Sequence, residues 1–174
     1  MSIALAASLF TLLVTMAAGG DVEKYEAWLN ARAKEPNMHR LPSGALIKKL
    51  RSSAVEGAKS PRTDSLVELH YDGFLPDGTK FESTRARRHT VMLRPNQVVR
   101  GWGEVLQLMR EGDEWEVVLP AALAYGEAGF DPEVPPNSPV YFVAELIRVR
   151  DDGKPAEEAS SSLRELIGRT HDEL

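Results

Sequence analysis

The sequence predicts an α+β fold in which a bent antiparallel β-sheet wraps around one short central helix. Apolar residues in Gln97–Met109 recur at steps of three or four, which is the spacing of one helix face. The segments on both sides are short, separated by turn signals, and in several cases alternate apolar with polar residues, as half-buried strands do. A single helix with an apolar stripe must bury that stripe against another element, and the predicted strands provide the sheet that does so.

The central helix is expected over Gln97–Met109, with Asn96 as its N-cap and Gly112 just beyond its end. Its apolar stripe consists of Val98, Val99, Trp102, Val105, Leu106 and Met109.

The strands are expected to form one domain over residues 45–150. In chain order they are Ala45–Leu50, Leu66–Leu75, Thr79–Ser83, Val91–Leu93, Glu114–Leu119 and Val140–Val149. Pro76-Asp77-Gly78 predicts a tight turn between the second and third strands, because Asp-Gly supports positive φ. Ala121–Ser138 is rich in Pro and Gly and is expected to be a long loop.

Composition narrows the class of protein. The chain has 174 residues, a net charge of −5 and no cysteine, which excludes disulfides and thiolate chemistry. It has no sustained basic run, so we expect no nucleic-acid partner. The histidines are scattered without the spacing of metal ligands, and we expect neither a metal nor another cofactor. These histidines are His39, His70, His89 and His171.

The first 20 residues are interpreted as a secretory signal peptide. Ile3–Ala18 is apolar or small except for two threonines and a serine, and Gly19-Gly20 and a charged sequence follow. The alternative is an uncleaved membrane anchor, which the run disfavours because it is shorter than the ~20 residues that a span needs. We expect no stable membrane span after cleavage.

The last four residues, His171-Asp172-Glu173-Leu174, spell HDEL, the retention signal of the endoplasmic reticulum lumen. The sequence therefore predicts a lumenal protein that binds the HDEL receptor. Residues 151–174 are expected to form a mobile polar tail that presents this signal. A capping box at Ser162 also allows one short helix through Ile167, although the solvated spacer is favoured.

Residues 21–44 are expected to form an N-terminal helical arm and a linker. In Val22–Ala33, one helix face carries Val22, Tyr25, Trp28 and Leu29. This face could pack on the same chain or against a partner, and packing on the same chain is favoured. A monomer is accordingly favoured over a dimer.

Four segments resemble one family in the right order. They are VELHYDGFLPDGTKFEST (Val67–Thr84), QVVRGW (Gln97–Trp102), LAYGEAG (Leu123–Gly129) and VPPNSPVYFVAEL (Val134–Leu146). Over about Ser65–Val149 the chain resembles the FKBP-type peptidyl-prolyl cis-trans isomerases. LPSG before the domain and GDEWEVVLP (Gly112–Pro120) resemble the Mip-like branch of that family.

The resemblance implies a shallow apolar pocket between the sheet and the helix, with the Trp102 indole as its floor. The catalytic residues that it implies are Tyr71, Phe81, Glu82, Trp102, Tyr125 and Phe142. The substrate-binding residues that it implies are Arg87, Val98, Val99, Phe130 and Val134. Glu82 stands where the family usually has Asp, so the charge is kept on a longer side chain.

The implied activity is the isomerisation of X-Pro bonds in proline-containing polypeptides, in support of secretory protein folding. Rotation about an amide bond faces a barrier of ~18–20 kcal/mol because twisting destroys its resonance. A dry aromatic pocket that fits the twisted amide lowers that barrier without a nucleophile or a metal. The alternative is a non-catalytic binding module or chaperone for proline-containing chains.

Overall fold

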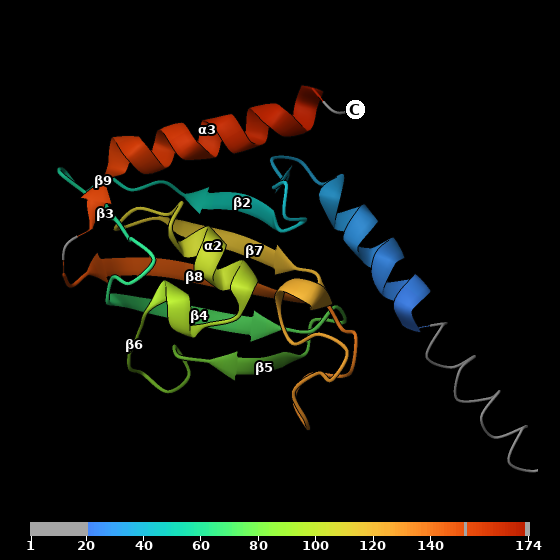
Figure 1. The fold of residues 1–174 in the computed structure, drawn as a ribbon. Coiled ribbons are helices and arrows are strands. Elements are labelled where there is room, and N and C mark those ends of the chain that lie inside the picture. Colours follow the sequence, from blue (N-terminus) through green and yellow to red (C-terminus); the bar gives the residue numbers. More distant parts are fainter. Residues whose placement is uncertain (1–20, 152, 173–174) are drawn as a thin grey trace, which may run out of the picture.

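The computed structural model describes residues 21–151 and 153–172, and its main feature is an antiparallel sheet that curls around one helix (Figure 1). Its longest strand, β8, lies between β7 and β4, and the strand order is β1-β2-β7-β8-β4-β5 with β6 also paired to β4. The strands are β1 (His39–Arg40), β2 (Leu46–Arg51), β4 (Val67–Phe74), β5 (Lys80–Ser83), β6 (Val91–Leu93), β7 (Glu114–Leu119) and β8 (Val140–Val149). This confirms the predicted fold class.

The central helix is shorter than predicted. A 3₁₀ turn, η1 (Pro95–Gln97), is followed by two extended residues and then by α2 (Arg100–Leu106). Val98 has φ −120° and ψ 174°, so the helical path is interrupted and Asn96 lies inside η1 instead of capping α2. The apolar spacing suggested a helix at Val98 and Val99, but their backbone is extended. Their side chains still lie on the same side as that of Trp102, because all three line one cavity.

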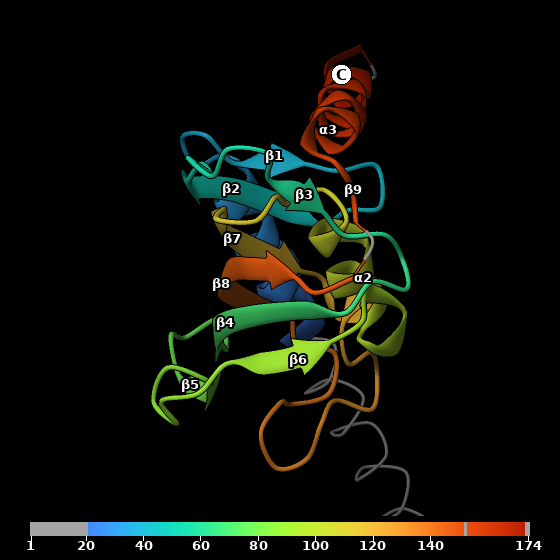
Figure 2. The same cartoon turned by 90° about the vertical axis from the view of Figure 1, so that its left-hand side faces the viewer.

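The main core fills the concave face of the sheet, which α2 covers (Figure 2). Trp102, Val105 and Leu106 of α2 are buried there, as is Met109 just beyond it. Every second residue of each strand faces these side chains, because successive side chains of a strand point to opposite faces of the sheet. Residue 115 of β7 and residue 142 of β8 are therefore in this core, whereas residues 118 and 141 are on the other face.

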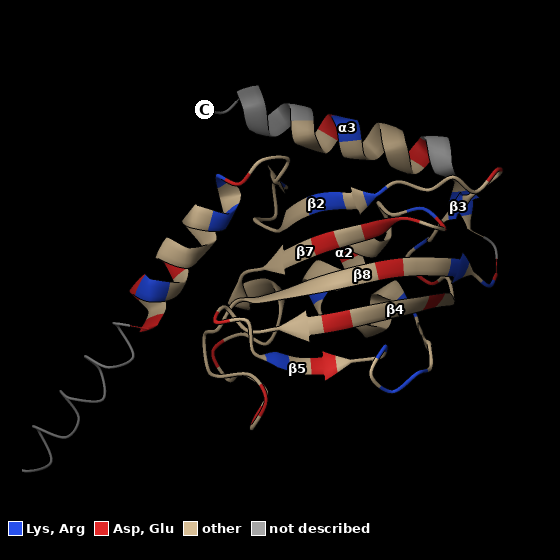
Figure 3. Ribbon diagram, turned by 180° about the vertical axis from the view of Figure 1, so that it is seen from behind, with Lys and Arg blue, Asp and Glu red and all other residues tan. Residues whose placement is uncertain are grey.

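The convex face carries charged side chains and the N-terminal helix. Seen from behind, acidic and basic bands follow one another across the strands (Figure 3). Arg85 connects neighbouring strands there, with its guanidinium 2.9 Å from the Glu114 carboxylate and 3.4 Å from that of Glu145.

Residues 21–33 are helical and pack on the same chain, as the favoured interpretation predicts. Trp28, Leu29 and Ala33 contact a small convex-side cluster that includes Val118 and Tyr141. Val22 remains 40% exposed at the other end of this helix.

The C-terminal segment corrects the prediction of a mobile polar tail with at most one short helix. Residues Lys154–Pro155 form β9, which pairs with β3 (Lys59–Ser60), and α3 follows over Ala156–Asp172. Ala159 and Leu163 are 0% and 4% exposed. Together with Leu166 and Ile167 they follow the i, i+4, i+7, i+8 spacing of an amphipathic helix, which the polar composition obscured.

The expected signal peptide and the last two residues of HDEL lie outside the described residues. In the part that the structure describes, no helix combines the length and apolar character required to cross a membrane. The same residues contain no cluster of His, Asp and Glu suited to a metal ion.

Candidate active site

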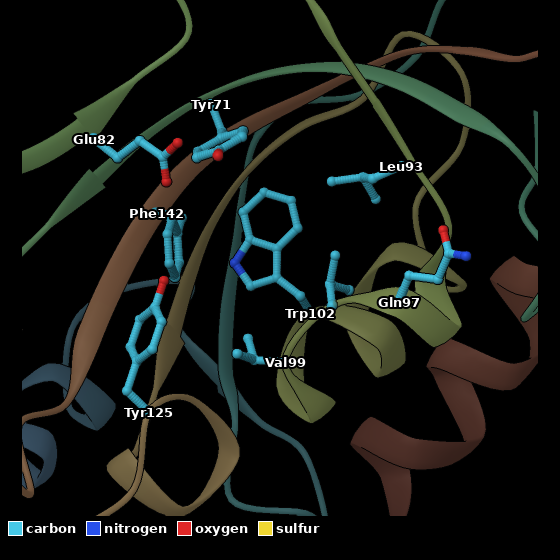
Figure 4. A pocket seen from close by; sticks show the side chains of 9 residues that line it. Tyr71, Glu82, Leu93, Gln97, Val99, Trp102, Tyr125 and Phe142 are labelled. Atoms are coloured by element: carbon cyan, nitrogen blue, oxygen red, sulfur yellow. The ribbon is translucent and has the colours of Figure 1, made fainter. Parts of the chain in front are cut away.

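A cavity of about 280 Å³ opens between α2 and the concave face of the sheet (Figure 4). It is largely apolar, with polar groups of Tyr71, Glu82 and Tyr125 on one side and Gln97 on the other. Its lining residues are Tyr71, Glu82, Leu93, Gln97, Val98, Val99, Trp102, Tyr125 and Phe142. This volume lies just below the ~300–1,000 Å³ of pockets for drug-sized ligands, and it suits one or two residues of a peptide.

The Trp102 indole forms the floor, and two glycines let the helix that carries it approach the rest of the fold. A Cβ on Gly101 would lie 2.5 Å from a methyl carbon of Leu119, and one on Gly103 would clash with the carbonyl oxygen of Pro95. The end of the Leu119 side chain can shift, but the Pro95 backbone cannot do so cheaply, so Gly103 is the glycine that the packing of α2 against η1 requires. The Trp102 side chain is thereby held at the bottom of the cavity, with only 6% of the residue exposed.

Two rings from neighbouring strands stand edge-on to the indole. The ring centroid of Tyr71 lies 5.1 Å from that of Trp102, and the ring centroid of Phe142 lies 4.9 Å from it. Both pairs are T-shaped, which is a favoured geometry for aromatic rings. The register of β4 against β8 sets this arrangement, because it places Tyr71 opposite Ala144 and Phe142 opposite Gly73.

Thr84 fixes the backbone of Tyr71. Its hydroxyl accepts the Tyr71 N–H at 2.8 Å and donates to the Tyr71 carbonyl at 3.1 Å. Thr84 is fully buried, so this clamp is shielded from water and holds the ring over the cavity.

The polar rim is made by Tyr71, Glu82 and Arg87. The Arg87 guanidinium lies 3.1 Å from the Glu82 carboxylate. Burial raises the pKa of the Tyr71 hydroxyl well above its ordinary value, and a hydrogen bond to the Glu82 carboxylate raises it further. The Arg87 pKa is also raised, first by its hydrogen bond to Glu82. Around neutral pH, Tyr71 is therefore a neutral donor and Arg87 a cation.

Tyr125 closes the cavity from the loop that follows η2 (Ala121–Leu123). Burial raises its pKa, with a smaller contribution from the Glu82 charge, so its hydroxyl also keeps its proton. The Phe130 ring stacks against it with centroids 5.6 Å apart. Figure 4 shows the Tyr125 hydroxyl pointing toward the aromatic cluster of the cavity.

The structure brings most of the predicted site residues together. Tyr71, Glu82, Trp102, Tyr125, Phe142, Val98 and Val99 line the cavity. Phe81 stands behind this wall, with its ring centroid 5.8 Å from that of Phe142, and Arg87 reaches the rim through Glu82. Phe130 is 54% exposed and contacts the site through the Tyr125 ring.

Val134 is the exception, because it does not reach the cavity. It is 1% exposed, belongs to the main core, and exchanges backbone hydrogen bonds with Phe130 across a bridge in the loop. The resemblance implies that Val134 binds substrate, whereas the structure places its side chain in the core. The bridge explains the outcome, since it holds Val134 turned inward.

Leu93 and Gln97 line the cavity but were not among the predicted residues. Leu93 comes from β6, where it pairs with Val67, and Gln97 ends η1. Gln97 had a sequence signal, since it opens the QVVRGW segment, whereas Leu93 only ends a predicted strand.

This arrangement suits the binding of an apolar, planar group whose polar edge reaches the rim. Aromatic walls and a floor would remove water from such a group, while two phenol hydroxyls and a carboxylate are placed to meet carbonyl oxygens and N–H groups. A cavity with this lining can act by desolvation and shape alone.

Residues 57–147 match the profile of the FKBP-type peptidyl-prolyl cis-trans isomerases, so the match covers about half of the chain. The chain belongs to this family of enzymes. The predicted family and class of enzyme are thereby confirmed.

The curated relatives include proteins of the Mip type. The chain is 42% identical to the macrophage infectivity potentiator of Trypanosoma cruzi over 139 residues, covering 79% of this chain and 70% of that protein. It is 39% identical to the outer membrane protein MIP of Legionella longbeachae, covering 73% of this chain and 53% of that protein. The chain thus spans about half the length of that bacterial relative.

Two solved structures share the fold. A peptidyl-prolyl cis-trans isomerase from Pseudomonas syringae has a TM-score of 0.70 and 28% identity, covering 76% of this chain and 96% of that chain. FkpA from Escherichia coli has a TM-score of 0.66 and 30% identity, covering 88% of this chain and 72% of that one.

Proposed function

We propose that this chain catalyses cis-trans isomerisation of X-Pro bonds in polypeptides that fold in the lumen of the endoplasmic reticulum. The observation that supports the activity most strongly is the cavity floored by Trp102 and walled by Tyr71 and Phe142, in a chain of the isomerase family. The location is supported by the signal-peptide pattern of residues 1–20 and by the HDEL sequence alone.

The proline ring occupies the apolar cavity over the Trp102 indole in this proposal. The aromatic walls strip water from the X-Pro amide, whose planar form has the more polar carbonyl and so loses more hydration than the twisted form. The difference lowers the barrier to rotation, because only interactions that favour the twisted state speed the reaction. No bond is made or broken.

The rim orients the chain around the proline. The Tyr125 hydroxyl stays protonated and donates to a substrate carbonyl, and the Glu82 carboxylate is placed to accept a substrate N–H. Arg87 holds Glu82 in place from the solvent side at 3.1 Å. These contacts keep the chain fixed on both sides of the bond while the amide turns.

A secretory compartment has a use for this activity. Uncatalysed X-Pro isomerisation takes about tens to hundreds of seconds and can limit the folding of a chain. A soluble isomerase retained in the lumen would shorten those steps for many proline-containing clients.

The activity is tested with a protease-coupled assay on a series of proline tetrapeptides that differ in the residue before proline. We expect the purified protein to raise the rate in proportion to its concentration. A rate equal to the uncatalysed one at every preceding residue would rule out the enzyme. Peptide binding without turnover would instead support the binding module.

The location is tested by expressing the chain with and without its last four residues. We expect the intact chain inside the secretory pathway and the shortened one in the medium. Equal retention of both forms would rule out the HDEL receptor as a partner.

A further inference from the structure

A second apolar groove lies on the far side of the loop that carries Tyr125. It has a volume of about 290 Å³ and runs between the N-terminal helix and residues 120–139. Its helix side is formed by Val22, Tyr25, Glu26 and Leu29, and its loop side includes Pro120, Ala121, Ala122, Gly126, Glu127, Asn137 and Pro139.

The way in which the N-terminal helix is anchored leaves the groove open. Trp28, Leu29 and Ala33 in its second half pack on the convex side of the sheet, and the Trp28 ring lies 6.1 Å from that of Tyr141. The residues that pack against the convex-side cluster all lie in the second half of the helix. Val22 is 40% exposed although it lies on the same helix face as Leu29, seven residues on.

The groove adjoins the active-site cavity through one turn of the loop. Tyr125 lines the cavity and the next residue, Gly126, lines the groove. The two sites therefore border the same loop at consecutive residues. This shared loop places the groove next to the part of a polypeptide that flanks a proline bound over Trp102.

The charges at the groove are of one sign. Residues 120–139 contain Glu127, Asp131 and Glu133 and neither Lys nor Arg. Glu26 and Glu127 line the groove and are exposed, and within the described chain neither one forms an ion pair. An apolar groove with unpaired carboxylates complements a segment that combines aliphatic and basic side chains.

We propose that this groove binds the segment flanking the proline of a client polypeptide and favours flanks that carry aliphatic residues together with Lys or Arg. The inference rests on the proposed isomerase function. The groove would add a second contact region that only long clients reach. Among long clients, the charge of the flanking segment would then determine the strength of binding.

The test compares two proline-centred 15-residue peptides, one with Leu and Lys in both flanks and one with Glu in place of each Lys, with a proline tetrapeptide. Two-dimensional NMR exchange measures the isomerisation of all three without a protease. The wild-type protein is expected to have a higher kcat/KM for the Lys peptide than for the Glu peptide.

The double substitution Glu26→Lys with Glu127→Lys reverses the charge at the groove. It is expected to lower the ratio of kcat/KM for the Lys peptide to that for the tetrapeptide by about tenfold, because two attractions become repulsions. It should also raise the same ratio for the Glu peptide. Val22→Gln removes apolar wall and should lower the ratio for both long peptides.

The matched control is Glu23→Lys with Glu56→Lys, which makes the same change of net charge at exposed residues outside the groove. Equal effects of the two double variants, or no effect of either, would overturn the proposal. A change in oligomeric state on light scattering in the Glu26 and Glu127 variant alone would also overturn it, since the groove would then hold a second copy.

The two hypotheses fail in different ways. A wild-type protein that accelerates none of the three peptides refutes the isomerase function. The anisotropy of a labelled Lys peptide still tests the groove in that case, because its binding should weaken in the Glu26 and Glu127 variant and not in the control.

Discussion

Two aromatic clusters lie on opposite faces of the same two strands, and only one of them is left open. On the concave face, Tyr71 of β4 and Phe142 of β8 surround the Trp102 indole. On the convex face, Phe74 of β4 stacks on Tyr141 of β8 with centroids 4.8 Å apart.

The convex cluster is closed by the N-terminal helix. Trp28 packs at its edge, and the Arg32 guanidinium lies 5.6 Å from the Trp28 ring centroid and 5.4 Å from that of Tyr141. Arg32 is also paired with Glu35 and Glu116. Within residues 21–151 and 153–172, no comparable helix covers the 280 Å³ in front of Trp102 on the concave side. Aromatic content alone therefore does not define a site; the space left beside the rings does.

The largest expected difference is between Phe142→Ala and Tyr141→Ala. Phe142 is 2% exposed and contacts three rings, so its truncation should lower the free energy of unfolding by about 3–5 kcal/mol and abolish isomerisation. Tyr141→Ala should cost about 2 kcal/mol and leave kcat/KM for a tetrapeptide unchanged. Urea unfolding and the tetrapeptide assay, below both unfolding midpoints, measure this. Loss of activity in a folded Tyr141→Ala would break the distinction between the faces.

The second-largest effect is expected from Gly103→Ala, which forces the backbone of α2 to move. Gly103→Ala places a Cβ against the Pro95 carbonyl oxygen, so α2 and η1 must move apart. We expect a loss of about 1–3 kcal/mol in stability and a large fall in kcat/KM, because Trp102 and Val98 no longer share one cavity. Gly78→Ala is the control, since it is strained at φ +87° in a turn with open space around it. Equal activity of the two variants would show that the floor tolerates displacement.

Tyr125→Phe should have a smaller effect that is confined to catalysis. Only the hydroxyl is removed, and the free energy of unfolding should stay within about 0.5 kcal/mol. Loss of one substrate hydrogen bond should lower kcat/KM by up to about tenfold. Trp28→Phe on the convex side should leave kcat/KM unaltered. An unchanged rate in Tyr125→Phe would remove this hydroxyl from the mechanism.

The smallest effect is expected with pH. The pKa of Tyr71 is raised above 10.0 in the folded chain, so the folded state binds this proton more tightly than the unfolded state does. Stability from this group is full below pH 10 and falls as the pH rises further, toward the folded-state pKa. Tyr71→Phe should therefore flatten the alkaline part of a stability-versus-pH curve. Parallel curves for the two proteins would contradict the raised pKa.

The sequence predicted the sheet better than the helices. Val91–Leu93 and Val140–Val149 have the predicted bounds, because alternation and turn residues are local signals. The start of α2 was misplaced since Val98 and Val99 continue a helical stripe while their backbone is extended. Helix α3 was expected only as a short alternative from Ser162 through Ile167, because Leu163 and its neighbours acquire a partner only in the folded domain.

The candidate site was predicted from a resemblance, and that prediction holds better for strand and helix residues than for loop residues. Strand and helix residues such as Tyr71, Trp102 and Phe142 face the cavity as expected, because parity or helical phase fixes their direction. Val134 lies in a loop where neither rule applies, and a bridge to Phe130 turns it into the core. Leu93 was missed because its neighbours in β6 give no hint that this edge strand borders a cavity.

The three tryptophans of the chain provide the most direct test of the central claim, since they report separately on the three environments. Trp102 is the cavity floor, Trp28 lies in the convex cluster and Trp115 is fully buried in the main core. Their indole N–H signals can be followed by NMR, after assignment by Trp→Phe variants, while a proline tetrapeptide is added. The account predicts that the Trp102 signal shifts with saturation while those of Trp28 and Trp115 stay in place. A shift of Trp28 with an unmoved Trp102 would contradict it.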